Sequence, residues 1–219
     1  MGNLLLIAGI LSTATSALSA DVTGKAIVLD GDTIVISSVT VRLHGIDAPE
    51  NGQDCQRANG TKYNCGAEAE KHLKRLLSGS VQCTGSQFDN YDRLIGTCES
   101  NSNNVSRAMV SAGWALAFRK FSTDYVSDEQ SAQASKRGLW AGSFDAPWDY
   151  RARRWQTAVE AAPDEQCPIK GNINRKGVKI YHAPWSRSYD RTRINTTKGE
   201  RWFCSEAEAV AAGWRAPYR

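Results

Sequence analysis

Three carboxylates that could do chemistry, those of Asp32, Asp47 and Glu50, lie close to one arginine in two short segments near the start of the chain. The segments are Asp-Gly-Asp-Thr, residues 30–33, and Arg-Leu-His-Gly-Ile-Asp-Ala-Pro-Glu, residues 42–50. Asp32 and Asp47 can supply the hard oxygen ligands that a divalent cation prefers. Glu50 can take a proton from water, and Arg42 can hold a phosphate through its planar fork. These residue types predict metal-assisted hydrolysis of a phosphodiester.

The elements that must position these residues are predicted to be short strands. Apolar and β-branched residues alternate with polar ones from Val22 to His44, and Asp-Gly and Ser-Ser turns interrupt the pattern. A polar turn at residues 89–92 separates two further strands. The five predicted strands are Lys25–Leu29, Thr33–Ile36, Val39–Leu43, Ser80–Thr84 and Arg93–Cys98.

Helices are predicted between and after these strands. Apolar spacing, with glycine at the ends, indicates helices at Ala67–Leu77, Val105–Ala112 and Asp124–Lys136. Arg-rich sequence with three tryptophans, residues 140–155, predicts a final helix packed back on the core, while residues 47–65 are predicted to form a long loop. This order predicts an α+β protein whose core is a five-stranded OB-fold barrel with three helices.

The ends of the chain differ from this core. Residues 1–20, with an apolar run from Leu4 to Ile10 and small residues after it, predict a secretory signal, the alternative being a buried helix. The core domain is expected at residues 21–157 and a linker at 158–166. Residues 167–219 are expected to form a small, disulfide-linked α+β module.

The six cysteines indicate an oxidising compartment, either the periplasm or the medium. Six cysteines allow 15 connectivities. Their order along the chain suggests three local pairs, and the competing interpretation is a zinc site, although no CxxC pair exists and the histidines are scattered. The pairs predicted are Cys55–Cys65, Cys83–Cys98 and Cys167–Cys204.

The net charge of +4 is distributed unevenly. Residues 167–219 contain 11 Lys and Arg against 4 Asp and Glu, a charge of +7, and the rest of the chain carries −3. A basic segment beside an acidic core is typical of a protein that binds a polyanion. Charge that serves only solubility is the alternative.

Three segments together resemble the signature segments of the staphylococcal nuclease (thermonuclease) family. They are residues 30–33, residues 42–50 and Asp-Asn-Tyr-Asp-Arg at 89–93, in the family's order and followed by Gly-Trp-Ala at 113–115. Taken singly, each has a structural interpretation as a hairpin turn, a helix cap or a surface arginine. The resemblance covers roughly residues 22–155 and implies a secreted homologue with an added Cys-containing module.

The resemblance implies a calcium-dependent endonuclease that cuts DNA and RNA at the 5′ P–O bond and leaves 3′-phosphate ends. Glu50 would activate the attacking water, and Arg42 and Arg93 would clamp the scissile phosphate. The implied ligands of one Ca²⁺ are Asp32, Asp47 and the backbone carbonyl of Ala48. DNA and RNA are the partners expected, with no membrane span in the mature chain and a monomeric state.

Family members often carry tyrosines where this chain has Phe118 and Phe121. These two rings offer a stacking surface for a base without a hydroxyl, and Arg119 and Lys120 could take over a phosphate contact. We therefore expect retained catalysis with weaker recognition of a terminal phosphate. The alternative is that both phenylalanines are core residues.

Two alternatives stay open at this point. The C-terminal module is either a basic tether for nucleic acid or the cell envelope, or a structural cap held by its disulfide. The whole chain could also be a catalytically weak or inactive OB-fold protein that only binds nucleic acid. The presence of every acidic and basic residue of the predicted site argues against the second of these.

Overall fold

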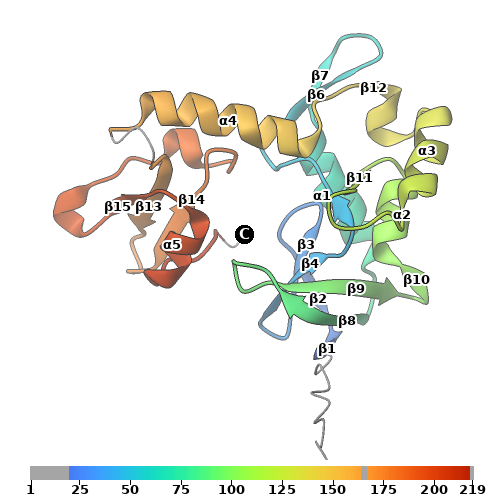
Figure 1. Ribbon diagram of the computed structural model, residues 1–219, viewed down its shortest axis with the longest axis horizontal. Helices are drawn as coiled ribbons and strands as arrows, with labels where there is room; N and C mark the ends of the chain where they lie inside the picture. Colours follow the sequence, from blue (N-terminus) through green and yellow to red (C-terminus); the bar gives the residue numbers. More distant parts are fainter. Residues whose placement is uncertain (1–19, 164–166, 218–219) are drawn as a thin grey trace, which may run out of the picture.

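The computed structural model describes residues 20–163 and 167–217. The predicted signal segment lies outside the described residues, except Ala20, which begins the first strand. Two bodies can be followed in Figure 1: a larger one built from residues 20–146 and a smaller C-terminal one, with helix α4 (Pro147–Ala161) running from one to the other.

The larger body is built on a mixed sheet of seven strands in the order β1-β8-β9-β4-β3-β2, with β10 paired to β9. β4 and β9 run parallel, and the other pairs are antiparallel. The five predicted strands are confirmed, and two edge strands are additional. The strands are β1 (Ala20–Gly24), β2 (Ala26–Val28), β3 (Thr33–Ile36), β4 (Val39–Leu43), β8 (Val81–Phe88), β9 (Leu94–Ser100) and β10 (Asn103–Asn104).

The predicted helices are also confirmed. α1 (Cys65–Leu76) and α2 (Val105–Ser111) each begin after an asparagine whose side chain accepts a hydrogen bond from a backbone N–H of the first turn. α3 (Val126–Ala134) follows, and α4 carries Pro147 in its first turn. α4 continues to Ala161, so the predicted linker at 158–166 begins inside a helix. Residues 158–161 are Ala-Val-Glu-Ala, mostly good helix formers, and Ala158 is buried.

The predicted loop at 47–65 is partly a hairpin, which corrects the prediction. β6 (Asp54–Arg57) pairs with β7 (Lys62–Asn64) and with β12 (Gly142–Ser143), a partner nearly 90 residues away whose approach no local pattern reveals. The Cys55–Cys65 disulfide closes this hairpin as predicted. Nearby, β5 (Ile46–Asp47) pairs with β11 (Leu116–Ala117).

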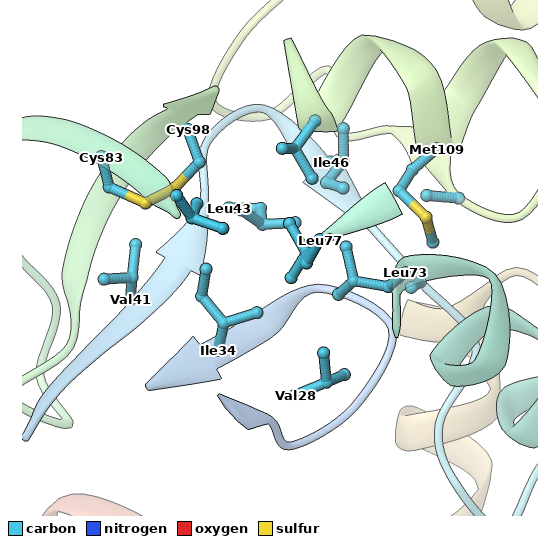
Figure 2. Close-up of a cluster of buried hydrophobic side chains, with 14 of the residues drawn as sticks. Val28, Ile34, Val41, Leu43, Ile46, Leu73, Leu77, Cys83, Cys98 and Met109 are labelled. Atoms are coloured by element: carbon cyan, nitrogen blue, oxygen red, sulfur yellow. A yellow bond between two sulfur atoms is a disulfide. The ribbon is translucent and has the colours of Figure 1, made fainter. Parts of the chain in front are cut away.

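The core of the larger body lies between the sheet and the helices (Figure 2). Ile34 and Leu43 of the sheet pack with Leu73 of α1, and all three are fully buried. The predicted Cys83–Cys98 disulfide joins directly opposed residues of β8 and β9. The α+β, OB-fold class that the sequence predicts is therefore confirmed.

The C-terminal module has its own small core. Strands β13 (Ile169–Ile173), β14 (Lys179–His182) and β15 (Arg201–Phe203) form a sheet in the order β14-β13-β15, and α5 (Glu206–Ala211) follows. Its core residues include Ile169, Phe203 and Trp214, and the Cys167–Cys204 disulfide is formed as predicted. Short 3₁₀ helices occur at Gly138–Ala141, Tyr189–Arg191 and Thr196–Lys198.

Within residues 20–163 and 167–217, no helix is long and apolar enough to cross a membrane. The three disulfides account for all six cysteines, so none is free.

Candidate active site

Asp32 and Asp47 converge on one guanidinium. Asp32 lies in the turn between β2 and β3, Asp47 ends β5, and Arg42 extends from β4. Arg42 donates from Nη1 to Asp32 Oδ1 at 2.8 Å and from Nη2 to Asp47 Oδ1 at 2.9 Å. The other oxygen of Asp32 accepts a hydrogen bond from the backbone N–H of Ala48 at 2.9 Å. Both carboxylates are buried. The strands and turns therefore hold the four oxygens of Asp32 and Asp47 near one guanidinium.

The pKa values of the two carboxylates shift in opposite directions. Burial tends to raise the pKa of Asp32, but Arg42 and the Ala48 N–H outweigh it and lower that pKa overall. Burial raises the pKa of Asp47 in spite of its arginine partners. Asp30, predicted only as a turn residue, accepts a hydrogen bond from the Asp32 N–H at 3.1 Å. Burial and the neighbouring Asp32 raise the pKa of Asp30 to about 7.

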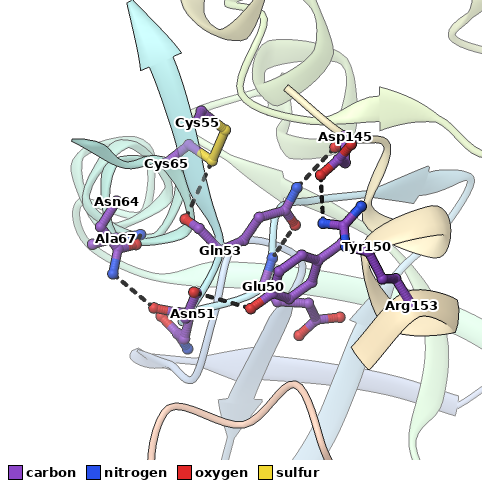
Figure 3. Close-up of a disulfide and its surroundings, with 11 residues drawn as sticks. Glu50, Asn51, Gln53, Cys55, Asn64, Cys65, Ala67, Asp145, Tyr150 and Arg153 are labelled. Carbon is purple, nitrogen blue, oxygen red and sulfur yellow. Dashed lines mark hydrogen bonds and ion pairs between the residues drawn. A yellow bond between two sulfur atoms is a disulfide. The ribbon is translucent and has the colours of Figure 1, made fainter. Parts of the chain in front are cut away.

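Glu50 sits on a loop that several side chains hold in place (Figure 3). The buried Gln53 accepts a hydrogen bond from the Glu50 N–H at 3.2 Å and donates one to the carbonyl of Asp145 at 2.8 Å. The Tyr150 hydroxyl of α4 donates to the carbonyl of Gly52 at 3.0 Å. Burial raises the pKa of Glu50 to about 8, although a nearby arginine opposes the rise. The loop thus fixes a carboxylate whose raised pKa makes it a stronger base than an exposed glutamate.

That arginine is Arg151 of α4, which no sequence motif predicted as a site residue. It donates to Glu50 Oε1 and to Asp47 Oδ2, each at 2.7 Å, and to Asp47 Oδ1 at 3.1 Å. Arg151 thereby joins the predicted base to a predicted metal ligand. The only sequence signal was an arginine-rich stretch at 151–154, and nothing in it shows which arginine faces the site.

Arg93 lines the same cleft but has a different partner. It forms an ion pair with Asp89 at 2.6 Å, across the turn that joins β8 to β9. Asp89 also shapes this turn by accepting hydrogen bonds from the backbone N–H groups of Tyr91 and Arg93. The positive charge of Arg93 contributes to the low pKa of Asp32, so the two residues share one electrostatic environment.

The aromatic segment after β11 borders the cleft as well. Phe118, Lys120 and Phe121 line it, and Phe118 stacks on Trp148 with ring centroids 5.6 Å apart. Phe118 is half-buried and Phe121 is exposed, so the core interpretation does not hold for Phe121. Arg119 is placed elsewhere: it pairs with the buried Glu129 and does not line the cleft.

The cleft that contains these residues has a volume of about 1520 Å³. The cleft is lined by most of the acidic and basic residues described above but not by Asp47, which is fully buried, and the C-terminal module provides part of its wall. Comparison with known proteins shows that this OB-fold body, with its cleft, is a nuclease of the hydrolase class. Residues 40–142 match the family model described as "Staphylococcal nuclease homologue".

Three relatives extend this likeness beyond the family model. The chain is 31% identical over 179 residues to a "Succinoglycan biosynthesis protein ExoI" of Rhizobium meliloti (strain 1021), covering 78% of this chain and 82% of the relative. It is 35% identical over 147 residues to an "Uncharacterized endonuclease" of Escherichia coli O157:H7, covering 63% and 90%. It is 31% identical over 152 residues to a "Micrococcal nuclease" of Shigella flexneri, covering 60% and 82%. The chain belongs to the staphylococcal nuclease family, as its sequence motifs predict.

Proposed function

We propose that this protein is an exported, calcium-dependent endonuclease that hydrolyses DNA and RNA at the 5′ P–O bond and leaves 3′-phosphate ends. The observation that carries the proposal is the convergence of Asp32, Asp47 and Glu50 on Arg42 and Arg151, two arginines that line one cleft. Phosphodiester hydrolysis needs a water, a base and compensation of the charge that grows on the phosphate oxygens. Glu50 is the proposed base, and Arg42 and Arg93 are the proposed phosphate clamp.

The donor set at this site fits calcium. Asp32, Asp47 and the carbonyl of Ala48 would hold the ion, because Ca²⁺ takes oxygen ligands and accepts water in its remaining positions. Four carboxylates, those of Asp30, Asp32, Asp47 and Glu50, face two guanidiniums, which leaves a formal charge of −2 when all are ionised. A divalent cation would balance this charge. When bound, the ion supplies charge stabilisation to the phosphate.

Three arginines of the cleft have carboxylate partners in this structure. Arg42 and Arg93 must exchange those partners, at least in part, for phosphate oxygens when substrate arrives. A guanidinium can do so because its five donors serve more than one acceptor. Arg42 is about one-fifth exposed, which leaves it accessible from the cleft.

Hydrolysis of single-stranded and double-stranded DNA and RNA, with calcium and then with excess chelator, tests this proposal. We expect degradation with calcium, recovery of activity when calcium is restored after chelation, and products that carry 3′-phosphates. Undiminished hydrolysis in chelator would contradict the calcium assignment, and products with 3′-hydroxyls would contradict the proposed bond. Binding without any cleavage would support the alternative of an inactive nucleic-acid-binding protein.

Arg151→Gln should bind calcium more tightly than the wild type. Arg151 and the ion would compete for the oxygens of Asp47, and coupling between two such cations is typically about 1–3 kcal/mol, or on the order of tenfold in affinity. Calorimetric titration with calcium measures the change without reference to catalysis. Arg153→Gln is the matched control, because Arg153 lies on the same helix and pairs with Asp145 instead. Equal affinities of wild type and Arg151→Gln would refute the competition.

Phe118→Tyr should increase the preference for 5′-phosphorylated over unphosphorylated oligonucleotides. A hydroxyl that donates to a charged phosphate contributes about 1.5 kcal/mol, which corresponds to about tenfold in the ratio of kcat/KM values. Phe144→Tyr adds the same hydroxyl outside the cleft and should leave the ratio unchanged. An unchanged ratio in Phe118→Tyr would show that residue 118 does not determine recognition of the terminal phosphate.

Export of this protein is a further part of the proposal. Three disulfides stabilise the described residues, and disulfides persist in oxidising compartments such as the periplasm or the medium. We also propose that the protein acts as a monomer.

A further inference from the structure

Helix α4 fixes the C-terminal module beside the catalytic cleft. Toward the larger body, the Tyr150 hydroxyl donates to the carbonyl of Gly52 at 3.0 Å. One turn further on, Arg154 donates from Nε to the carbonyl of Pro184 at 2.9 Å and pairs with Asp190 at 3.0 Å. The helix is therefore attached to both bodies within a single turn, and Figure 1 shows it spanning them.

The module lies directly against the loop that carries Glu50. A Cβ placed on Gly52 would lie 3.6 Å from the carbonyl oxygen of Trp185 and 3.7 Å from the Cα of Arg187. Trp185 also meets Trp155 of α4, with ring centroids 6.3 Å apart. The module segment that contains Trp185 and Arg187 is therefore a neighbour of the catalytic loop and not a remote appendage.

Two exposed arginines of this module, Arg187 and Arg191, line the cleft. Among the residues that the structure describes, neither forms an ion pair with a carboxylate. In contrast, Arg42, Arg93 and Arg151 all do. Arginines that face a cleft without a carboxylate partner can contact phosphate without first breaking an ion pair.

Exposed aromatic rings of the larger body line the same cleft. Of the large apolar residues in the described ranges, only Ile27, Phe88 and Phe121 are strongly exposed. Phe88 and Phe121, which are 54% and 65% exposed, both line the cleft. A groove that combines cationic side chains with exposed aromatic rings is typical of proteins that bind single strands, because unpaired bases can stack on the rings.

We propose that the C-terminal module is the second wall of a binding cleft for single-stranded nucleic acid. Arg187 and Arg191 bind phosphates that flank the scissile phosphate, while Phe88 and Phe121 of the larger body stack with bases. This inference rests on the proposed function, since it assigns the substrate side of that site. It replaces both earlier hypotheses for the module, the general tether and the structural cap, with a local role in substrate binding.

The test is the salt dependence of binding by the full chain and by Arg187→Gln/Arg191→Gln. The probe is a fluorescent oligothymidylate with phosphorothioate linkages, which resist hydrolysis. Its length of roughly 12 nucleotides falls within typical site sizes. Each phosphate contact to a single strand contributes about 0.7 to the slope of log K against log salt, so the double variant should lose about 1.4. Relative to equal binding at 1 M salt, this slope difference corresponds to about 25-fold weaker binding at 0.1 M salt.

The matched control is Arg175→Gln/Lys176→Gln, which removes the same charge from a turn of the module that does not line the cleft. We expect this control to keep the slope of the wild type, and thermal unfolding to confirm that both variants fold. Equal losses of slope in the two variants would show general charge attraction. An unchanged slope in Arg187→Gln/Arg191→Gln, or tighter binding, would overturn the inference.

A hairpin duplex of the same probe chemistry tests the preference for single strands. Its paired bases cannot stack on Phe88 or Phe121, so we expect it to bind more weakly than the oligothymidylate. Equal binding would contradict that part of the inference. The single-stranded probe is not cut, so this binding test does not depend on catalysis. Binding through the module without degradation of any substrate would refute the proposed catalysis and leave the binding cleft in place.

Discussion

Replacing Glu50 by glutamine should lower kcat by about 10²–10⁴-fold on single-stranded DNA, the range that a positioned general base typically contributes. Glutamine keeps the size of the side chain and an oxygen that can accept a hydrogen bond from Arg151. It cannot take a proton from water. The pKa of Glu50, which burial raises to about 8, makes this carboxylate a stronger base than an exposed glutamate.

The measurement is kcat at saturating substrate and calcium, with a calcium titration to show that the variant still binds the ion. Glu99→Gln is a suitable control, since Glu99 is an exposed residue of β9 that does not line the cleft. A Glu50→Gln enzyme that digests DNA at the rate of the wild type would remove Glu50 from the role of base. A loss shared by Glu99→Gln would point to a general effect on the protein.

Replacing Arg42 by lysine should lower kcat/KM by about 10²–10³-fold, which corresponds to about 3–4 kcal/mol of transition-state stabilisation. Arg42 reaches Asp32 with one nitrogen and Asp47 with the other, and the same fork can hold two oxygens of a phosphate. Lysine places one compact charge at the end of a flexible stem, so it cannot make both contacts at once. Charge alone would therefore not restore activity.

Steady-state kinetics and thermal unfolding of Arg42→Lys should be measured together, because Arg42 also neutralises buried carboxylates. If the variant unfolds as the wild type does and still loses activity, the loss belongs to the chemistry. Arg107→Lys is the control, since Arg107 is an exposed residue of α2 whose partner is Asp128, outside the cleft. Retention of kcat/KM within a few-fold in Arg42→Lys would show that the bidentate fork is unnecessary.

Local sequence patterns predicted much of this protein correctly. Alternating apolar residues identified the strands on both sides of Asp32 and Arg42, because side-chain period and turn residues are local properties of the chain. The three disulfides paired as neighbours in the sequence. The grouping of Asp32, Arg42 and Asp47 was also predictable, since all three lie in one run of short strands and the turns between them.

Features that depend on packing between elements were missed or misread. Arg119 looked available for phosphate, but the buried Glu129 of α3 holds it. The hairpin of β6 and β7 looked like a loop, because its third partner, β12, comes late in the chain. In each case the deciding contact is with a partner in another element, and no local pattern of apolar spacing or turn residues identifies that partner.

The sequence by itself determined the family, the OB-fold class, the pairs of cysteines and the acidic and basic residues near Asp32. Only the tertiary structure brought Arg151 onto Asp47 and Glu50, and only it placed Arg187 and Arg191 of the module along the same cleft. The physical reason is the packing of α4, whose hydrogen bonds and aromatic contacts to both bodies set its position and direction. Residue spacing specifies which face of a helix or strand a side chain occupies, whereas the neighbour of that face is decided by packing across the whole chain.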